Sequence, residues 1–460
     1  MSNQKNRREL NRREMLKLSL AGLGGGVLGL SFLSGCAVES TTDSLVAPLT
    51  PVNPFYDAVI QIFYGGGPSQ TDTFDPKPGS VNNVFGTIDV GVNDKYGQPL
   101  RISNVLPKIA AAVQGGTAGL GIVRSLVHAN GDHDEAELAT QSFWRTIGPA
   151  MIYPSIGSVM AYYFQGQTAI NVASVAIDGA CNNTKGNPIP SALNGSTSGM
   201  TAVLTRPVTT ARYDRRKRML DIVNAGMTQR PDGLVQTTAA SSDDAYRITT
   251  TGTAAAAFNL TGKTLLPATD SSFSRRITLA QELVKAGVPY VALNLNGNDS
   301  HTLNMATITN KWGANTDTAV AQLATNLAGS GKRVLVVMGG EFGRTPKISD
   351  DPEALGDGRD HWNDGFSWGL LSINQPKFRT GAFGSTGPDG LWTQTSSSRG
   401  GLPGRLVDPV ELKDLGAFIY RALGFQIGNS TYNIPLSTGM APPVDATNNS
   451  SALMNYFGLV

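Results

Sequence analysis

Short apolar runs alternate with helix-like segments between residues 55 and 425 of this chain. Five of these runs are candidate strands: 58–64, 120–123, 170–177, 288–295 and 333–338. Because the runs are apolar on both faces, they suit a parallel sheet that helices cover on both sides. The sequence therefore predicts an α/β fold, with a mostly parallel central sheet sandwiched by helices.

Helical patterns occupy several of the intervals between these runs. Residues 275–286 and 317–328 each carry apolar side chains at helical spacing. A last helix is expected to begin at Asp408-Pro409, a capping residue followed by proline, and to end at Leu423. With 40% hydrophobic residues, the chain can bury a core, which excludes a disordered protein.

We expect a single domain over residues 55–460. Residues from about 180 to 270 differ in composition, because Asn, Thr, Ser, Gly and Ala dominate there. This segment is interpreted as an insertion that carries one basic helix, 211–227. No second domain is predicted.

The N-terminus has the features of an export signal. Residues 11–17 (NRREMLK) resemble a twin-arginine signal, and an apolar stretch of about 16 residues follows, shorter than a membrane span. LSGC at residues 33–36 resembles a bacterial lipobox, with Cys36 as the lipidated residue. We therefore expect a twin-arginine lipoprotein-type signal at 1–35 and a flexible tether at 36–54, with an ordinary cleaved signal peptide as the alternative.

Charge and cysteine content exclude several classes of protein. The chain has 37 basic and 35 acidic residues, and removal of residues 1–35 takes away six and two of these, leaving 31 against 33. A net charge of −2 gives no reason to expect nucleic acid as a partner. Two cysteines cannot build a disulfide framework, and Cys181 alone would remain after lipidation of Cys36.

Ligand-type side chains follow the predicted strands. Each of the four histidines, His128, His133, His301 and His361, lies in a loop beyond a strand or in a Gly-rich loop near an acid. Ligands bind at the carboxyl ends of the strands in open parallel sheets. Carboxylates and imidazoles together are ligands of Zn, Mn or Fe, although a single histidine is more often a hydrogen-bonded loop residue.

Five segments, in order, resemble one bacterial family. They are GGGPSQTDTFDPKP, IVRSLVHANGDH, NGNDSHTLN, VVMGGEFGRTP and GRDHW. The resemblance is to domain-of-unknown-function family 1501, which is grouped with the alkaline phosphatase and sulfatase superfamily, and it runs from about residue 56 to 425. It implies an alkaline phosphatase-like fold and a two-metal hydrolase of phosphate or sulfate esters.

The resemblance also implies a set of metal ligands. Asp299, His301 and His361 match the first metal's ligands. For the second metal, Glu341 stands where an aspartate is usual, and Phe342 stands where a histidine is usual. Further candidate ligands are Asp72, Asp75 and Asp360, of which the first two would replace an early aspartate whose place is taken by Gly65 and Gly66.

The remaining candidate roles concern catalysis. The nucleophile is open among Ser69, Thr71 and Thr73. Arg124 and Arg344, together with Arg359, could clamp the anionic group of an ester, or could instead pair with nearby carboxylates.

These features lead to a functional hypothesis and one alternative. The hypothesis is an exported hydrolase of small or polymeric anionic esters, dependent on one or two divalent ions, with Zn expected first and Mn or Ca as alternatives. The alternative is a catalytically eroded member that acts as an envelope-anchored binding or assembly protein for a polymer or a secreted protein. We expect a periplasmic location, with a lipid anchor in the outer membrane.

Overall fold

The computed structural model describes most of the chain after residue 52. The described residues are 53–127, 130–143, 153–164, 168–182, 191–197, 204, 209–227, 246, 248–249, 252–350, 353, 356–390, 406–427, 432–436, 439–444 and 448–460. The signal, Cys36, all but the last two residues of the tether, and His128 lie outside these residues.

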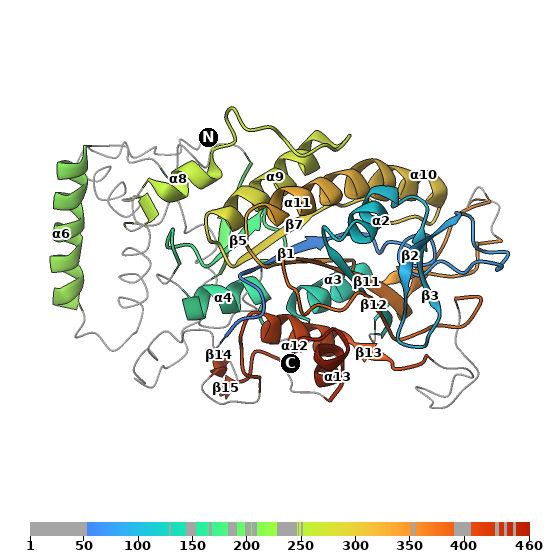
Figure 1. Cartoon of the computed structure of the whole chain (residues 1–460). Coiled ribbons are helices and arrows are strands. Elements are labelled where there is room, and N and C mark those ends of the chain that lie inside the picture. Colours follow the sequence, from blue (N-terminus) through green and yellow to red (C-terminus); the bar gives the residue numbers. More distant parts are fainter. Residues whose placement is uncertain are drawn as a thin grey trace, which may run out of the picture.

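A nine-stranded sheet forms the centre of the fold (Figure 1). Its strands are β1 (Ala58–Phe63), β4 (Gly119–Val127), β5 (Ser174–Ile177), β6 (Leu193–Gly195), β7 (Tyr290–Asn294), β8 (Val334–Gly339), β11 (Asp364–Ile373), β12 (Gly381–Phe383) and β13 (Val410–Glu411). The spatial order is β12-β4-β11-β8-β1-β7-β5-β6, and β13 also pairs with β4. All neighbouring strands are parallel except β11, which runs antiparallel to both β4 and β8. The predicted, mostly parallel sheet is confirmed.

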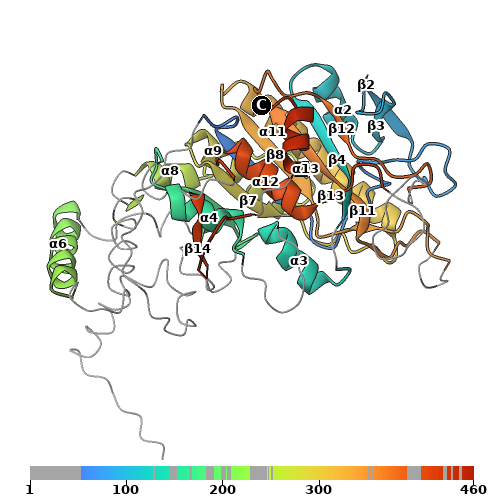
Figure 2. The ribbon, with the colours of Figure 1, turned by 90° about the horizontal axis from the view of Figure 1, so that it is seen from below.

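Helices cover both faces of this sheet, as predicted. One face packs against α2 (Pro107–Gln114), α9 (Ser271–Lys285) and α11 (Thr318–Ala328). The other face packs against α3 (His133–Ser142), α4 (Ile156–Phe164), α12 (Leu412–Ala422) and α13 (Asn448–Tyr456), as the view from below shows (Figure 2). Alternate residues of β1 serve the two cores: Ile60 and Ile62 belong to the first, Val59 and Phe63 to the second. The sheet is therefore buried on both sides.

Smaller elements surround the sheet. They are the hairpin of β2 (Thr87–Asn93) and β3 (Pro99–Ser103), the pair β9 (Gly343–Arg344) and β10 (His361–Trp362), the pair β14 (Ile434–Leu436) and β15 (Gly439–Ala441), and the helical segments α6 (Thr210–Met227), α8 (Thr253–Phe258), α10 (Asn304–Ile308) and the π-helix η1 (Thr309–Asp317). Among the described residues, no helix is both long and apolar enough to cross a bilayer.

The predicted start of the last helix is wrong. Asp408 has a positive φ of 48°, and Val410 and Glu411 pair with β4 before α12 begins at Leu412. Glu411 and Asp414 form a reciprocal capping box there, so the side chain that caps the helix stands three residues later than predicted.

Candidate metal centre

The candidate centre lies where the carboxyl ends of several strands meet. Asp299 and His301 follow β7, Glu341 follows β8, and His133 is the first residue of α3, which follows β4. His361 lies in β10, where it pairs with Arg344 of β9. Because the strands β4, β7 and β8 run parallel, the loops beyond them converge at one edge of the sheet.

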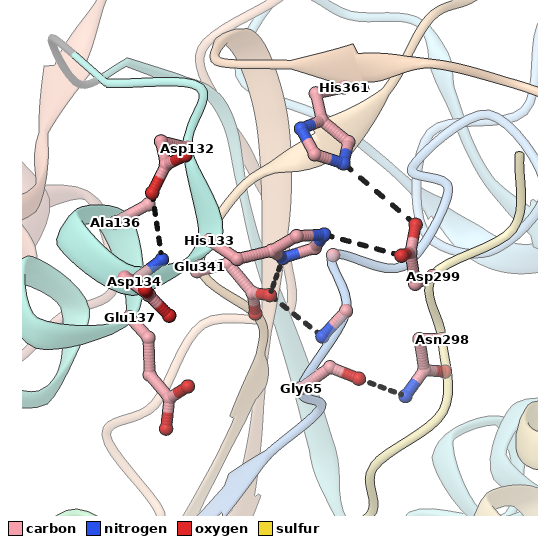
Figure 3. Close-up of polar contacts among 12 residues, drawn as sticks. Gly65, Asp132, His133, Asp134, Ala136, Glu137, Asn298, Asp299, Glu341 and His361 are labelled. Atoms are coloured by element: carbon pink, nitrogen blue, oxygen red, sulfur yellow. Dashed lines mark hydrogen bonds and ion pairs between the residues drawn. The ribbon is translucent and has the colours of Figure 1, made fainter.

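Imidazole nitrogens surround the Asp299 carboxylate (Figure 3). Its Oδ2 atom lies 3.4 Å from His133 Nε2, and its Oδ1 atom lies 3.2 Å from His301 Nε2 and 3.8 Å from His361 Nε2. The ligand atoms of His133, Asp299 and His361 all lie within 4.8 Å of one another. His301 Nε2 is a further candidate ligand atom and lies 3.0 Å from His361 Nε2. The structure thus brings Asp299, His301 and His361 together, with His133 as a fourth member.

Each histidine has a hydrogen-bond partner for its outer nitrogen, Nδ1. His133 Nδ1 lies 2.8 Å from Glu341 Oε1, and His301 Nδ1 lies 2.9 Å from Asp360 Oδ1. His361 Nδ1 lies 2.6 Å from the carbonyl oxygen of Gly131. Because carboxylates and carbonyls accept hydrogen bonds, these partners favour a proton on every Nδ1. In the neutral rings, each Nε2 then carries a lone pair.

The inward-facing atoms are therefore all acceptors when the rings are neutral. His133 Nε2 is buried and has no hydrogen-bond partner among the described residues. His301 Nε2 and His361 Nε2 face one another at 3.0 Å, and both face the carboxylate of Asp299. Facing lone pairs repel one another unless a proton or a cation lies between them. The residues present consequently fit a divalent metal, and outer hydrogen bonds of this kind are the usual way in which metal-binding imidazoles are oriented.

Hydrogen bonds, burial and nearby charges shift the pKa values of the residues in the centre. The hydrogen bond to Glu341 raises the pKa of His133 above its ordinary value, against the opposing effect of burial. Burial lowers the pKa of His361, so this ring is neutral at neutral pH. Burial acts to raise the pKa of Asp299, but the charge and hydrogen bond of Arg344 hold it below the ordinary value. The centre thus supplies a charged carboxylate and a neutral imidazole at neutral pH.

Arg344 is buried beneath the centre. Its Nη2 atom donates to Asp299 Oδ1 at 2.6 Å and to the carbonyl oxygen of Gly66, and its Nε atom donates to that of Gly67 at 2.8 Å. The side chain has no solvent exposure. Arg344 therefore pairs with a carboxylate, which is the second of the two roles expected for it. Its hydrogen bonds also hold the loop after β1 against the loop after β7.

Asp72 is held in a buried ion pair. It accepts hydrogen bonds from Arg359 Nε at 2.8 Å, Ser69 Oγ at 2.6 Å and Asn304 Nδ2 at 2.8 Å. Arg359 is fully buried as well and also donates to Asn82. Within the described part of the chain, Asp72 is not in the group of ligand atoms around Asp299.

Asp75 is likewise enclosed by partners. Its oxygens contact Arg124 Nε and Lys77 Nζ, both at 2.9 Å, and Thr386 Oγ1 at 2.6 Å. Arg124 also donates to the carbonyl oxygens of Phe74 and Arg101. Asp72 and Asp75, the two aspartates expected as replacement metal ligands, thus form ion pairs inside the fold. Arg124 pairs with a carboxylate, which is the second of the two roles expected for it.

The three candidate nucleophiles share one buried loop. Ser69 Oγ donates to Asp72, Thr71 Oγ1 lies 3.2 Å from Ser69 Oγ, and Thr73 Oγ1 donates to the Ser69 carbonyl at 2.7 Å. All three side chains are buried. The hydroxyl groups of Ser69 and Thr71 therefore contact one another, that of Ser69 also contacts Asp72, and that of Thr73 contacts the Ser69 backbone.

Two features of the centre were not predicted. His133 had no assigned role, although its position six residues beyond β4 placed it at the same edge of the sheet. Phe342, whose ring centroid lies 4.3 Å from that of His361 and 4.9 Å from that of His133, packs against both imidazoles. Glu341 lies on the outer side of His133, where its Oε1 atom accepts hydrogen bonds from His133 Nδ1 and from Gly66 N.

Comparison with solved structures gives distant similarities. The C-terminal periplasmic domain of EcEptC from Escherichia coli, in complex with Zn, is 10% identical, with 82% of this chain and 85% of that chain covered and a TM-score of 0.37. Streptococcus pyogenes phosphoglycerol transferase GacH, in complex with sn-glycerol-1-phosphate, is 9% identical, with coverage of 89% and 86% and a TM-score of 0.32. Lipoteichoic acid synthase LtaP from Listeria monocytogenes is 9% identical, with coverage of 85% and 76% and a TM-score of 0.35. These values say nothing about the reaction of this chain.

Comparison at the level of sequence gives one assignment. No curated protein matches this chain. One family model, described as "Protein of unknown function (DUF1501)", matches residues 56–371, which is more than two thirds of the sequence and includes all the described residues of the centre. The chain belongs to the DUF1501 family.

Proposed function

We propose that this chain is an exported, metal-dependent hydrolase of phosphate or sulfate esters. The observation that carries the proposal is the convergence of His133, His301 and His361 on Asp299, with each Nδ1 engaged on the outer side. Three of these groups, His133, Asp299 and His361, would hold one divalent ion, with zinc as the first candidate because imidazole and carboxylate are its common ligands. Glu341 would orient the ligand His133 and Asp360 would orient the neighbouring His301, and neither carboxylate would bind the ion itself.

The side chains of the centre have distinct tasks in this proposal. Glu341 orients His133, and the Gly131 carbonyl orients His361, so that both Nε2 atoms point inward. Arg344 keeps Asp299 ionised and in place. His301, which is half exposed, lies at the solvent side of the group beside Asp360. A divalent metal bound there supplies Lewis-acid polarisation of an ester oxygen.

The choice of ester rests on the resemblance to family 1501 and on the grouping of that family with the alkaline phosphatase and sulfatase superfamily. Export rests on residues 1–35 and membrane attachment on Cys36, which would tether the protein to the outer membrane and place the centre in the periplasm. Substrates reached from there would be small or polymeric anionic esters. Two metals are not part of the proposal, because Asp72 and Asp75 are bound to arginines.

A second candidate function is supported by the same centre. Four converging donors would complete a tetrahedral zinc site and leave no open position for a substrate. Ser69, Thr71 and Thr73 are buried in contact with one another or Asp72, and Phe342 stacks against two of the imidazoles. Under this proposal the metal stabilises the fold of an envelope-anchored protein that binds a polymer or a secreted protein.

Metal content and turnover separate these proposals. The parent and the variants His133→Ala, His361→Ala and His301→Ala would be purified, with Asp350→Ala as a control because Asp350 is an exposed partner of Lys347. The first two changes should abolish bound zinc, and the control should retain it. Phosphate monoesters, phosphate diesters and sulfate esters would then be tested with Zn, Mn and Ca.

The variant His301→Ala decides between the two functions. If the enzyme proposal holds, the parent turns over one ester class and this variant keeps bound metal. Metal loss in His301→Ala together with absence of turnover in the parent would favour the structural zinc site. Unchanged metal content in both His133→Ala and His361→Ala would contradict both proposals.

A further inference from the structure

Helix α6 carries a basic and apolar face outside the proposed centre. Its 18 residues include five basic and two acidic ones, a net charge of +3 in a chain whose total is +2. At about 100° per residue, six side chains fall within about 120° of arc. These six residues, the α6 face, are Arg212, Arg215, Arg216, Met219, Ile222 and Val223.

The six side chains of the α6 face are exposed, and the described contacts of the helix lie on its other side. On the other side of the helix, Tyr213 stacks on Tyr246 with ring centroids 5.5 Å apart, and Lys217 Nζ lies 5.7 Å from the same ring. Met219, Ile222 and Val223 are 67%, 73% and 49% exposed. The helix lies at the opposite end of the described structure from α10, which follows His301 (Figure 1).

The two kinds of side chain are separated along the helix axis. The three arginines occupy the first two turns, and the three apolar side chains occupy the next two. The arginines are exposed and form no ion pair with any described residue. A nucleic acid would pair with the arginines but would leave the apolar side chains in water. A surface that offers anionic groups above an apolar layer matches both halves of the face, as at the interface of a bilayer.

We propose that the α6 face docks on a membrane surface that contains anionic lipids. The arginines would contact phosphate headgroups, and Met219, Ile222 and Val223 would enter the boundary of the acyl chains. This inference builds on the lipid-anchored placement proposed above. The 17 residues from Cys36 to Val52 span at most roughly 60 Å, so the anchor would hold the folded part of the chain close to the membrane.

Vesicle binding tests this inference without the acyl chain and without metal. The chain from residue 36 onward, with Cys36→Ser, would be sedimented with vesicles of phosphatidylcholine alone or mixed with phosphatidylglycerol. Both apolar cores are built from residues after 55, so removal of the signal leaves them intact. Neither a failed metal site nor an unlipidated Cys36 changes the outcome, so failure here is distinct from failure of the proposed hydrolase.

Two triple variants of the α6 face should weaken binding to anionic vesicles. R212Q/R215Q/R216Q removes three positive charges, each of which should raise the affinity for anionic vesicles roughly fivefold, so the affinity should fall on the order of a hundredfold. Binding of the parent should also weaken as salt is raised, because salt screens these charges. M219S/I222S/V223S should reduce the affinity for these vesicles at least roughly tenfold, because three apolar side chains would no longer be withdrawn from water on binding.

Matched controls lie elsewhere on the surface. K285Q/K347Q/K377Q removes three exposed charges, and V81S removes a side chain that is 95% exposed. Both should bind as the parent does. Equal binding by the parent and both α6 variants would overturn the proposal. Absence of vesicle binding by the parent would also overturn the proposal. That outcome includes the case in which the arginines bind an acidic protein and not a membrane.

Discussion

His133 Nδ1 lies 2.8 Å from Glu341 Oε1, although the two residues are 208 positions apart in the chain. Glu341 also accepts a hydrogen bond from Gly66 N at 2.7 Å, so one carboxylate joins the loop after β1 to the first turn of α3. With Nδ1 held by this contact, His133 Nε2 points at Asp299 Oδ2, 3.4 Å away.

Glu341→Gln should weaken metal binding by about ten- to a hundredfold, as loss of a partner behind a metal ligand commonly does. The uncharged amide accepts a weaker hydrogen bond from His133 Nδ1 than the carboxylate does, and it can also turn its NH2 group toward the ring. Titration calorimetry with zinc would measure the affinity, with Glu353→Gln as a control on a residue outside the centre. An affinity within twofold of the parent would show that Glu341 does not orient the ligand.

Gly66→Ala should disturb the same centre from the loop after β1. Gly66 has a φ of 110°, and a Cβ there would lie 2.2 Å from the backbone nitrogen of Asp299. We expect a loss of about 2–4 kcal/mol in the free energy of unfolding, from strain and overlap together, and a lower zinc affinity.

Gly97→Ala is the matched control for that change. Gly97 also has a positive φ, 80°, but a Cβ there meets no atom within 4 Å. It should cost roughly 1–2 kcal/mol by denaturation in urea and leave zinc affinity unchanged. Equal effects of the two substitutions on metal binding would mean that close packing at Gly66 does not position Asp299.

The sequence predicts the centre of the sheet well and one of its long strands poorly. β1, β7 and β8 are apolar on both faces, so their composition alone indicates buried parallel strands. β11 was not predicted, because Gly365, Ser367 and Gly369 interrupt its apolar pattern. A Cβ at Gly369 would lie 2.5 Å from the ring of Phe74, so this glycine answers a packing contact that no local pattern reveals.

Long-range pairing also limits what can be predicted about the site. The sequence correctly indicated that Asp299 and His301, which follow β7, lie near His361, which the structure places in β10. Asp72 and Asp75 have the same residue type and lie after a strand, but buried arginines from residues 359 and 124 engage them. Which carboxylates face an arginine and which face an imidazole is decided by contacts between distant segments, and a single sequence does not contain that information in its local pattern.

Arg359→Met should destabilise the protein by about 3–5 kcal/mol, because it leaves the carboxylate of Asp72 buried without its counter-charge. Urea denaturation of the metal-free protein would measure the change. The double variant Asp72→Asn, Arg359→Met should be less destabilised than the single Arg359 variant. If the single change cost under 1 kcal/mol, the pair would not be an important part of the folded structure.

Asp75 should make the protein acid-sensitive. Burial acts to raise the pKa of Asp75, but the charges of Lys77 and Arg124 and the hydrogen bond from Thr386 hold it below the ordinary value. A carboxyl group whose pKa is lowered in the folded state contributes stability above its unfolded pKa, about 3.9, and loses that contribution as the pH falls through the folded value. The free energy of unfolding should therefore differ most between the parent and Asp75→Asn at neutral pH, and the difference should shrink below about pH 4. Asp350→Asn, which removes an exposed partner of Lys347, should differ little from the parent at any pH. A difference between the parent and Asp75→Asn that stays constant from pH 7 to pH 3 would mean that the Asp75 carboxylate is not stabilised by its two cations.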